Sequence, residues 1–242
     1  MTISKIKRGL RLYKTKERAE VNAWFFKTGK GQYGEGDIFL GVTVPDIRKV
    51  VKSFFSELTL NDAVELLQSK YHEDRLAGCI LMVELFKIAT KNNSIKEQKK
   101  IYTTYLNSTS RINNWDLVDL SCKDIVGEYL YKVRPCIVVL YKLAKSKSLW
   151  ERRIAIVSTF AFIKKGEHKD TFAICEVLMN DKEDLMHKAC GWMLREVGKN
   201  CGIETLNIFL EKYATKMPRT MLRYAIERHH PVERVKILRK SK

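Results

Sequence analysis

Apolar residues recur three and four positions apart along most of the chain, a spacing that places them on one face of an α-helix. Alternation of apolar and polar residues, the pattern of a half-buried strand, is weak by comparison. We therefore predict an all-α protein. The predicted helical segments include Asp62–Ser69, Glu73–Ala89, Trp115–Leu130, Ile137–Ala144, Trp150–Ile163, Phe172–Met179, Asp184–Val197 and Glu204–Tyr213.

The four prolines, Pro45, Pro135, Pro218 and Pro231, each fit the start of a helix. Proline is tolerated there because the N–H that it lacks would have no partner within the helix. Only short polar breaks separate the helical segments, so we expect residues 1–242 to form a single domain.

A small residue recurs inside the apolar helices at intervals of 34 to 44 residues, at Ala77, Ser121, Ala155, Ala189 and Ala225. Chance placement of common alanines is the alternative explanation. Otherwise, this period is typical of stacked antiparallel helix pairs. It predicts a right-handed superhelical solenoid of HEAT-like repeats, in which the small residues let neighbouring helices approach closely.

The residue two places before each small one is basic or potentially basic in four of five cases: Arg75, Arg153, His187 and Arg223, with Asp119 as the exception. Equivalent positions of stacked repeats point the same way. We therefore expect one column of side chains on a basic concave face, interrupted by a single carboxylate. A row of cations suits a phosphate backbone.

The overall charge favours the same partner. The 242 residues include 45 Lys and Arg against 28 Asp and Glu, a formal net charge of +17. Such an excess points to a polyanion, although a generically basic protein is the alternative. No run of about 18 apolar residues predicts a membrane span, and Met1–Arg18 lacks the apolar core of a secretory signal. We expect a cytoplasmic, nucleoid-associated protein.

The six cysteines, Cys79, Cys122, Cys136, Cys175, Cys190 and Cys201, form no CxxC pair and are typical of small apolar residues in a reducing compartment. His187 and Cys190 lie three apart, but no second pair completes a zinc site, so we expect no metal. Five of the 12 glycines fall in Thr28–Gly41, which lacks the ending of a phosphate loop. This glycine-rich stretch is either a connector or a mobile loop or hairpin that touches DNA.

Trp115 and Asp119 lie four residues apart and share one face of the predicted helix. Core packing is the expected role of Trp24 and Trp150. A single carboxylate is enough to cleave a glycosidic bond when the leaving group is already cationic, as an alkylated purine is, because no proton need be supplied. A tryptophan face favours such a base, so Trp115, Asp119, Arg153 and Trp192 suit N-glycosidic hydrolysis. A plain Asp119–Arg153 salt bridge remains the alternative.

The chain resembles the DNA alkylation repair proteins of the AlkD type, which are HEAT-like-repeat DNA glycosylases. The matching segments are Phe39–Arg48, Tyr71–Ala77, Trp115–Asp119, Trp150–Ala155, Lys188–Glu196 and Met217–Glu227. The resemblance implies excision of cationic N3- or N7-alkylpurines from duplex DNA by a monofunctional mechanism, without Schiff-base lysine or metal. It assigns the aromatic pair at the lesion to Trp115 and Trp192, the catalytic carboxylate to Asp119 and the phosphate contact to Arg153, with Arg152 as the weaker match.

We thus predict an alkylpurine DNA glycosylase that acts as a monomer on double-stranded DNA containing alkylated bases, without a nucleotide or other cofactor. The expected DNA contacts are Arg153, Arg152, Arg75, Lys188, His187 and Arg223. The glycine-rich stretch is longer than in the familiar glycosylases, and some relatives with such elements do not catalyse. The alternative is therefore a non-catalytic protein that binds branched or damaged DNA, and a third possibility is a protein-interaction solenoid.

Overall fold

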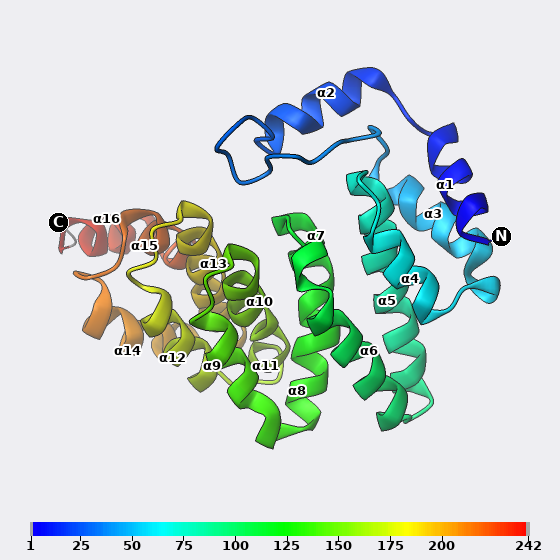
Figure 1. Ribbon diagram of the computed structural model, residues 1–242. Coiled ribbons are helices and arrows are strands. Elements are labelled where there is room, and N and C mark those ends of the chain that lie inside the picture. The colour runs from blue at the N-terminus through cyan, green and yellow to red at the C-terminus, as the bar shows by residue number, and fades with distance from the viewer. Residues whose placement is uncertain (1, 241–242) are drawn as a thin grey trace. The chain divides into compact units, whose positions relative to one another are not determined.

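The computed structural model describes residues 2–240, which form helices joined by turns and one longer connection (Figure 1). Across these residues the all-α prediction is confirmed, because extended pairing is limited to an isolated bridge between Ile38 and Tyr71. None of the helices in this range combines the length and apolar character needed to span a membrane. The chain divides into two compact units, unit 1 (Met1–Ser121) and unit 2 (Cys122–Lys242), where the sequence suggested one domain.

Unit 1 is a bundle of seven α-helices and two short 3₁₀ turns in its described part. They are α1 (Thr2–Leu12), α2 (Lys16–Phe25), α3 (Val44–Phe54), η1 (Phe55–Glu57), α4 (Leu60–Leu67), α5 (His72–Lys91), α6 (Ile95–Asn107), η2 (Thr109–Arg111) and α7 (Trp115–Cys122). Helix α5 is the centre of this bundle, packed by α3, α4 and α6. It is buried on nearly all sides, and even the charged residues of its first turn are inaccessible to solvent.

Helix α2 lies at the edge of unit 1 and has no buried residue (Figure 1). Its Trp24 is 81% exposed, so the expectation that Trp24 packs in the core is wrong. The side chain points away because α2 docks through Ala19, Asn22 and Ala23, which recur at helical spacing and are half-buried. Trp24 lies on another face.

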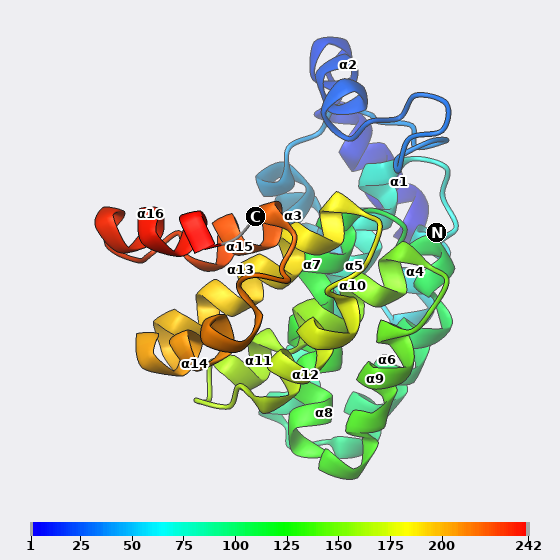
Figure 2. The same cartoon turned by 90° about the vertical axis from the view of Figure 1, so that its left-hand side faces the viewer.

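Unit 2 begins in the same helical run as α7 and continues to the C-terminus. Its elements are a π-helical turn (Lys123–Gly127), α8 (Glu128–Lys132), η4 (Arg134–Ile137), α9 (Val138–Ala144), α10 (Leu149–Ser158), α11 (Phe160–Ile163), α12 (Lys169–Leu178), α13 (Asp184–Asn200), α14 (Ile203–Tyr213), α15 (Arg219–Ala225) and α16 (Pro231–Lys240). Helix α13 is central and packs against α10, α12, α14 and α15. Figure 2 shows α13 and α15 side by side.

Local sequence accounts for several helix starts. Thr59 and Asp62 form a reciprocal capping box at α4, and Ser148 accepts the Glu151 N–H at α10. Pro45 lies in the first turn of α3, Pro231 begins α16, Pro135 lies in the first turn of η4, and Pro218 is the N-cap of α15. The prediction that all four prolines mark helix starts is therefore confirmed, although the Pro135 helix is a 3₁₀ turn.

All five recurring small residues are buried inside helices or at their ends. The tightest approaches between helices, however, occur at neighbouring glycines. A Cβ placed on Gly191 of α13 would lie 2.5 Å from the Met221 carbonyl oxygen of α15, and one placed on Gly127 would lie 2.3 Å from the Ser158 carbonyl oxygen. Here a hydrogen atom is the largest side chain that fits.

We expect Gly191→Ala to destabilise unit 2 by about 1–3 kcal/mol, because the new methyl group would push the backbone of α13 away from the backbone of α15. Gly198→Ala in the same helix is the matched control: the nearest atoms to its Cβ all belong to side chains, and the closest is a Leu206 methyl, a flexible side-chain end, at 2.9 Å. Both substitutions gain the same helix propensity. Urea unfolding measures the difference, and equal midpoints for the two variants would contradict the close approach.

Candidate functional site

Helix α7 carries the two residues that the sequence pairs for chemistry. Asn114, buried just before it, accepts the Trp115 backbone N–H through its side-chain oxygen, which gives a partner to one of the N–H groups that a helix start leaves unpaired. Trp115 and Asp119 lie one turn apart and are both half-buried. The structure thus places the indole and the carboxylate on one face of one helix, as expected.

The Trp115 indole contacts the end of α2 and the connection between α2 and α3 (residues 26–43), which contains the glycine-rich stretch. The Phe26 ring stacks on it at 5.0 Å between centroids, and the Phe25 ring approaches edge-on at 5.8 Å. The indole Nε1–H donates to the Tyr33 hydroxyl at 3.3 Å. None of these three partners was identified from the sequence.

Asp37 anchors the α2–α3 connection to the rest of unit 1. Its carboxylate accepts hydrogen bonds from the Asn114 amide at 2.9 Å and from His72 Nδ1 at 3.0 Å, and it pairs with the Arg75 guanidinium. The His72 Nε2 atom contacts the Asp116 carboxylate at 2.7 Å. One buried cluster therefore links the connection, the first turn of α5 and the first turn of α7.

Glu73, next to His72, binds the backbone of the same connection. Its carboxylate accepts the N–H groups of Leu40 and Gly41, both at 2.8 Å, and of Val42 at 3.3 Å. Gly41 has a φ of 80°, and a Cβ there would lie 2.1 Å from the Thr15 carbonyl oxygen. Hence the glycine-rich stretch is a docked connector held by buried carboxylates, and the hairpin considered from the sequence is not formed.

The protonation of the cluster follows from its charges. Burial alone would lower the pKa of His72, but the carboxylates of Asp116 and Asp37 outweigh it and raise that pKa to about 9. Burial acts to raise the pKa of Asp37, yet the hydrogen bond from His72 and the charge of Arg75 lower it below its usual range. At neutral pH the cluster therefore holds His72 as a cation against ionised Asp37.

Arg75, one of the predicted DNA contacts, is buried within unit 1. It is 3% exposed, and besides Asp37 its guanidinium contacts the carbonyl oxygens of Ser69 and Lys70 at 3.3 and 3.4 Å. Those carbonyls precede α5 and face the same guanidinium that binds Asp37. Arg75 is thus bonded within the fold, and its contact with DNA stays a prediction.

Arg152 repeats this arrangement in unit 2. It donates to the carbonyl oxygens of Ser146 and Lys147 at 3.1 and 3.0 Å, and it forms a two-pronged ion pair with Asp181. Its donors thus close the turn before α10, and the contact of Arg152 with DNA stays a prediction.

A sequence signal for this arrangement exists: a Ser-Lys pair stands six residues before each of the two arginines, at Ser69–Lys70 and Ser146–Lys147. His187 also reaches back six residues, with Nε2 at 2.7 Å from the Asp181 carbonyl oxygen. The contacts therefore align Arg75 with Arg152 and His187. The predicted column, which aligned Arg153, is out of register by one residue.

The remaining predicted residues lie in unit 2 and differ in exposure. Arg153 is 6% exposed and donates to the Leu185 carbonyl oxygen at 2.8 Å. Lys188 is half-buried and pairs with Asp184 at 2.7 Å, whereas Arg223 is exposed. Trp192 is half-buried beside Phe160, with 6.3 Å between the ring centroids. The burial of these residues and their contacts within the protein therefore differ from one to the next.

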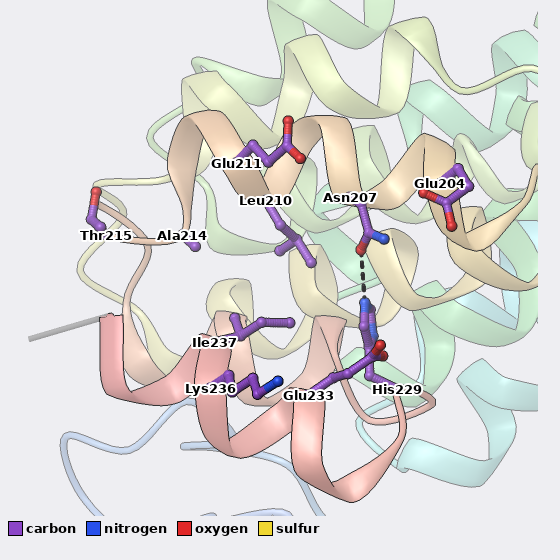
Figure 3. A pocket seen from close by; sticks show the side chains of 10 residues that line it. All are labelled: Glu204, Asn207, Leu210, Glu211, Ala214, Thr215, His229, Glu233, Lys236 and Ile237. Atoms are coloured by element: carbon purple, nitrogen blue, oxygen red, sulfur yellow. Dashed lines mark hydrogen bonds between the residues drawn. The ribbon is translucent and has the colours of Figure 1, made fainter.

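A separate cavity of about 450 Å³ lies in unit 2 between α14 and α16 (Figure 3). Glu204, Glu211 and Glu233 line it, and His229 Nε2 donates a hydrogen bond to the Asn207 side-chain oxygen at 2.9 Å. Burial lowers the pKa of His229, which is neutral near pH 7. Three carboxylates repel phosphate, so this cavity does not suit a DNA backbone.

Within residues 2–240, no three His, Cys, Asp or Glu side chains converge on a possible metal position.

The raised pKa of His72 predicts a pH-dependent stability. Folding raises the pKa of His72, so protonated His72 stabilises the folded protein fully below the unfolded-state pKa of 6.5. This stabilisation is lost as the pH rises through about 9. We expect the free energy of unfolding, measured in urea, to fall across this interval. His72→Gln, which cannot titrate, should give a flatter profile; identical slopes for the two proteins would argue against a charged His72.

Comparisons with known proteins agree with these observations. No curated protein sequence matches the chain. Among solved structures, it is similar to a predicted DNA alkylation repair enzyme from Enterococcus faecalis, at 14% identity and a TM-score of 0.67, over 90% of this chain and 97% of that one. That likeness concerns the fold. The family model described as DNA alkylation repair enzyme matches residues 6–229, and the chain therefore belongs to the DNA alkylation repair enzyme family.

Proposed function

We propose that this protein is a DNA glycosylase that hydrolyses the N-glycosidic bond of cationic N3- or N7-alkylated purines in duplex DNA. The observation that carries the proposal is the pairing of Trp115 with Asp119 on one face of α7, both partly open to solvent. Membership of a DNA alkylation repair family supports DNA damage as the substrate. Asp119 matches the catalytic carboxylate of the AlkD-type enzymes that the sequence resembles.

The reaction requires few catalytic groups from the protein. An N3- or N7-alkylpurine carries a positive charge and departs as a neutral base with both bonding electrons, so no general acid is required. The sugar left behind is an oxocarbenium-like cation, which the Asp119 carboxylate stabilises electrostatically while it orients the water that adds to C1′. The proton of that water passes to solvent. The Trp115 face attracts the cationic base before it leaves, and Trp192 provides a second aromatic surface.

DNA binding is assigned to the basic side chains of unit 2. The net charge of +17 supports a polyanionic partner. Arg153, His187, Lys188 and Arg223 remain the proposed backbone contacts, in a right-handed HEAT-like solenoid with a basic concave face. The protein acts as a monomer, needs no metal or nucleotide, and resides in the cytoplasm at the nucleoid.

We expect Asp119→Asn to keep its affinity for alkylated duplex DNA and to lose base release by about 100-fold or more, because the neutral amide no longer stabilises the sugar cation. Chromatography of free 3-methyladenine and 7-methylguanine measures the release. Asp124→Asn, which removes a partly exposed carboxylate five residues further on, is the control and should stay active.

Equal excision by Asp119→Asn and the unmodified protein would overturn the catalytic role. If the unmodified protein releases no base from alkylated DNA but binds branched DNA, the non-catalytic alternative is correct.

Arg153→Ala should lower both DNA affinity and the rate of base release. Loss of one phosphate contact should also reduce the slope of log K against log salt by about 1. Arg152→Ala removes the same charge from the neighbouring residue but breaks the Asp181 pair, so it should lower the melting temperature and leave the salt slope unchanged. Salt titrations of binding compare the two variants; an unchanged slope for Arg153→Ala would remove it from the proposed interface.

A further inference from the structure

The Trp115 indole is held at one face and one edge by a segment distant in sequence. Phe26 stacks against one face at an interplanar angle of 25°. Phe25 approaches the ring at 71°, and the indole is half-buried. We take the face that Phe26 does not cover to be the one that receives a base. A half-buried tryptophan near a helix N-terminus otherwise has several staggered rotamers to choose from, so these contacts select the direction in which that face points.

The edge contact is made by Tyr33, in the glycine-rich stretch. Its hydroxyl accepts the Trp115 Nε1–H at 3.3 Å and donates to the Phe25 carbonyl oxygen, also at 3.3 Å. A hydroxyl can do both at once because it has one proton and two lone pairs. Tyr33 thereby ties the indole to the backbone at the end of α2.

The segment that carries Tyr33 is itself fixed. Four residues further on, Asp37 is buried against His72, Arg75 and Asn114, and Glu73 accepts the backbone N–H groups of residues 40–42. Phe26 stacks on Phe39, which stacks on the His72 ring at 4.5 Å. Removing either carboxylate would leave a buried cation or buried amides unpaired, which is costly. The connection is therefore a rigid support.

We infer that Tyr33 is a positioning residue for Trp115, and that the Asp37-anchored glycine-rich stretch is a fixed wall of the alkylpurine site. The inference rests on the proposed function, because it takes Trp115 to face the damaged base. Tyr33 acts on the reaction through the indole: it holds the ring that receives the cationic purine. Misplacing a binding group by about 1 Å can cost as much as 100-fold in rate, so loss of one weak hydrogen bond should have a smaller, measurable effect.

Tyr33→Phe tests this inference because it removes the hydroxyl and keeps the ring. With ¹⁵N-labelled tryptophan, the protein gives one indole N–H resonance for each of Trp24, Trp115, Trp150 and Trp192, and Trp115→Phe identifies one of them by its loss. In Tyr33→Phe we expect the Trp115 resonance to move upfield while the other three stay in place. We also expect base release at saturating DNA to slow by about threefold to tenfold, the range for a single net hydrogen bond, with DNA affinity unchanged.

Tyr13→Phe is the matched control, since Tyr13 also lies in unit 1 but packs its ring against Lys49. It should alter neither the Trp115 resonance nor base release. An unmoved Trp115 resonance in Tyr33→Phe would overturn the inference, and so would a moved resonance with a normal rate of release. If the unmodified protein releases no base, the proposed function fails instead, and the resonance alone then decides whether Tyr33 holds the indole.

Discussion

Four charges at the N-terminus of α5, three buried and one half-buried, determine the geometry around α7. Asp37 and Asp116 flank His72, and Arg75 binds Asp37. Two anions face two cations, so the cluster is neutral when His72 is protonated. Burying any one of them without its partner would cost several kcal/mol. Because the charges come from three segments, with His72 and Arg75 both in the first turn of α5, satisfying all four fixes the α2–α3 connection, α5 and α7 together. The placement of Trp115 depends on this balance.

Part of the positive charge of the chain is also used in contacts within the fold. Arg75 and Arg152 each close the turn before a helix by binding carbonyl oxygens five and six residues back and one aspartate, and His187 makes the six-residue contact. The two arginines are counted in the net charge of +17, yet much of their bonding capacity serves the protein backbone. The cations available for DNA are therefore fewer than composition suggests. Adjacent arginines differ in partner, since Arg152 binds Asp181 and Arg153 donates to the Leu185 carbonyl oxygen.

Part of the candidate site could be predicted from the sequence and part could not. Trp115 and Asp119 were identified together because their spacing lies within one helix, where four residues make one turn. Tyr33 and Asp37 were not, because they act across the fold on residues about 80 positions away. The glycine-rich stretch indicated only an irregular segment. A Ser-Lys pair six residues before Arg75 and again before Arg152 was a visible signal, but its meaning depends on carbonyl groups whose direction a sequence does not state.

By itself the sequence determined the helical class, most of the central helices, the helix starts at proline and the pairing of Trp115 with Asp119. These features depend on interactions between residues close in the chain, where the period of the helix converts spacing into direction. Only the tertiary structure decided which charges are buried, which glycines bring helices into contact and which residues hold the Trp115 indole. Those outcomes depend on the cost of leaving a buried charge or polar group unpaired. That cost is set by partners that approach from distant parts of the chain.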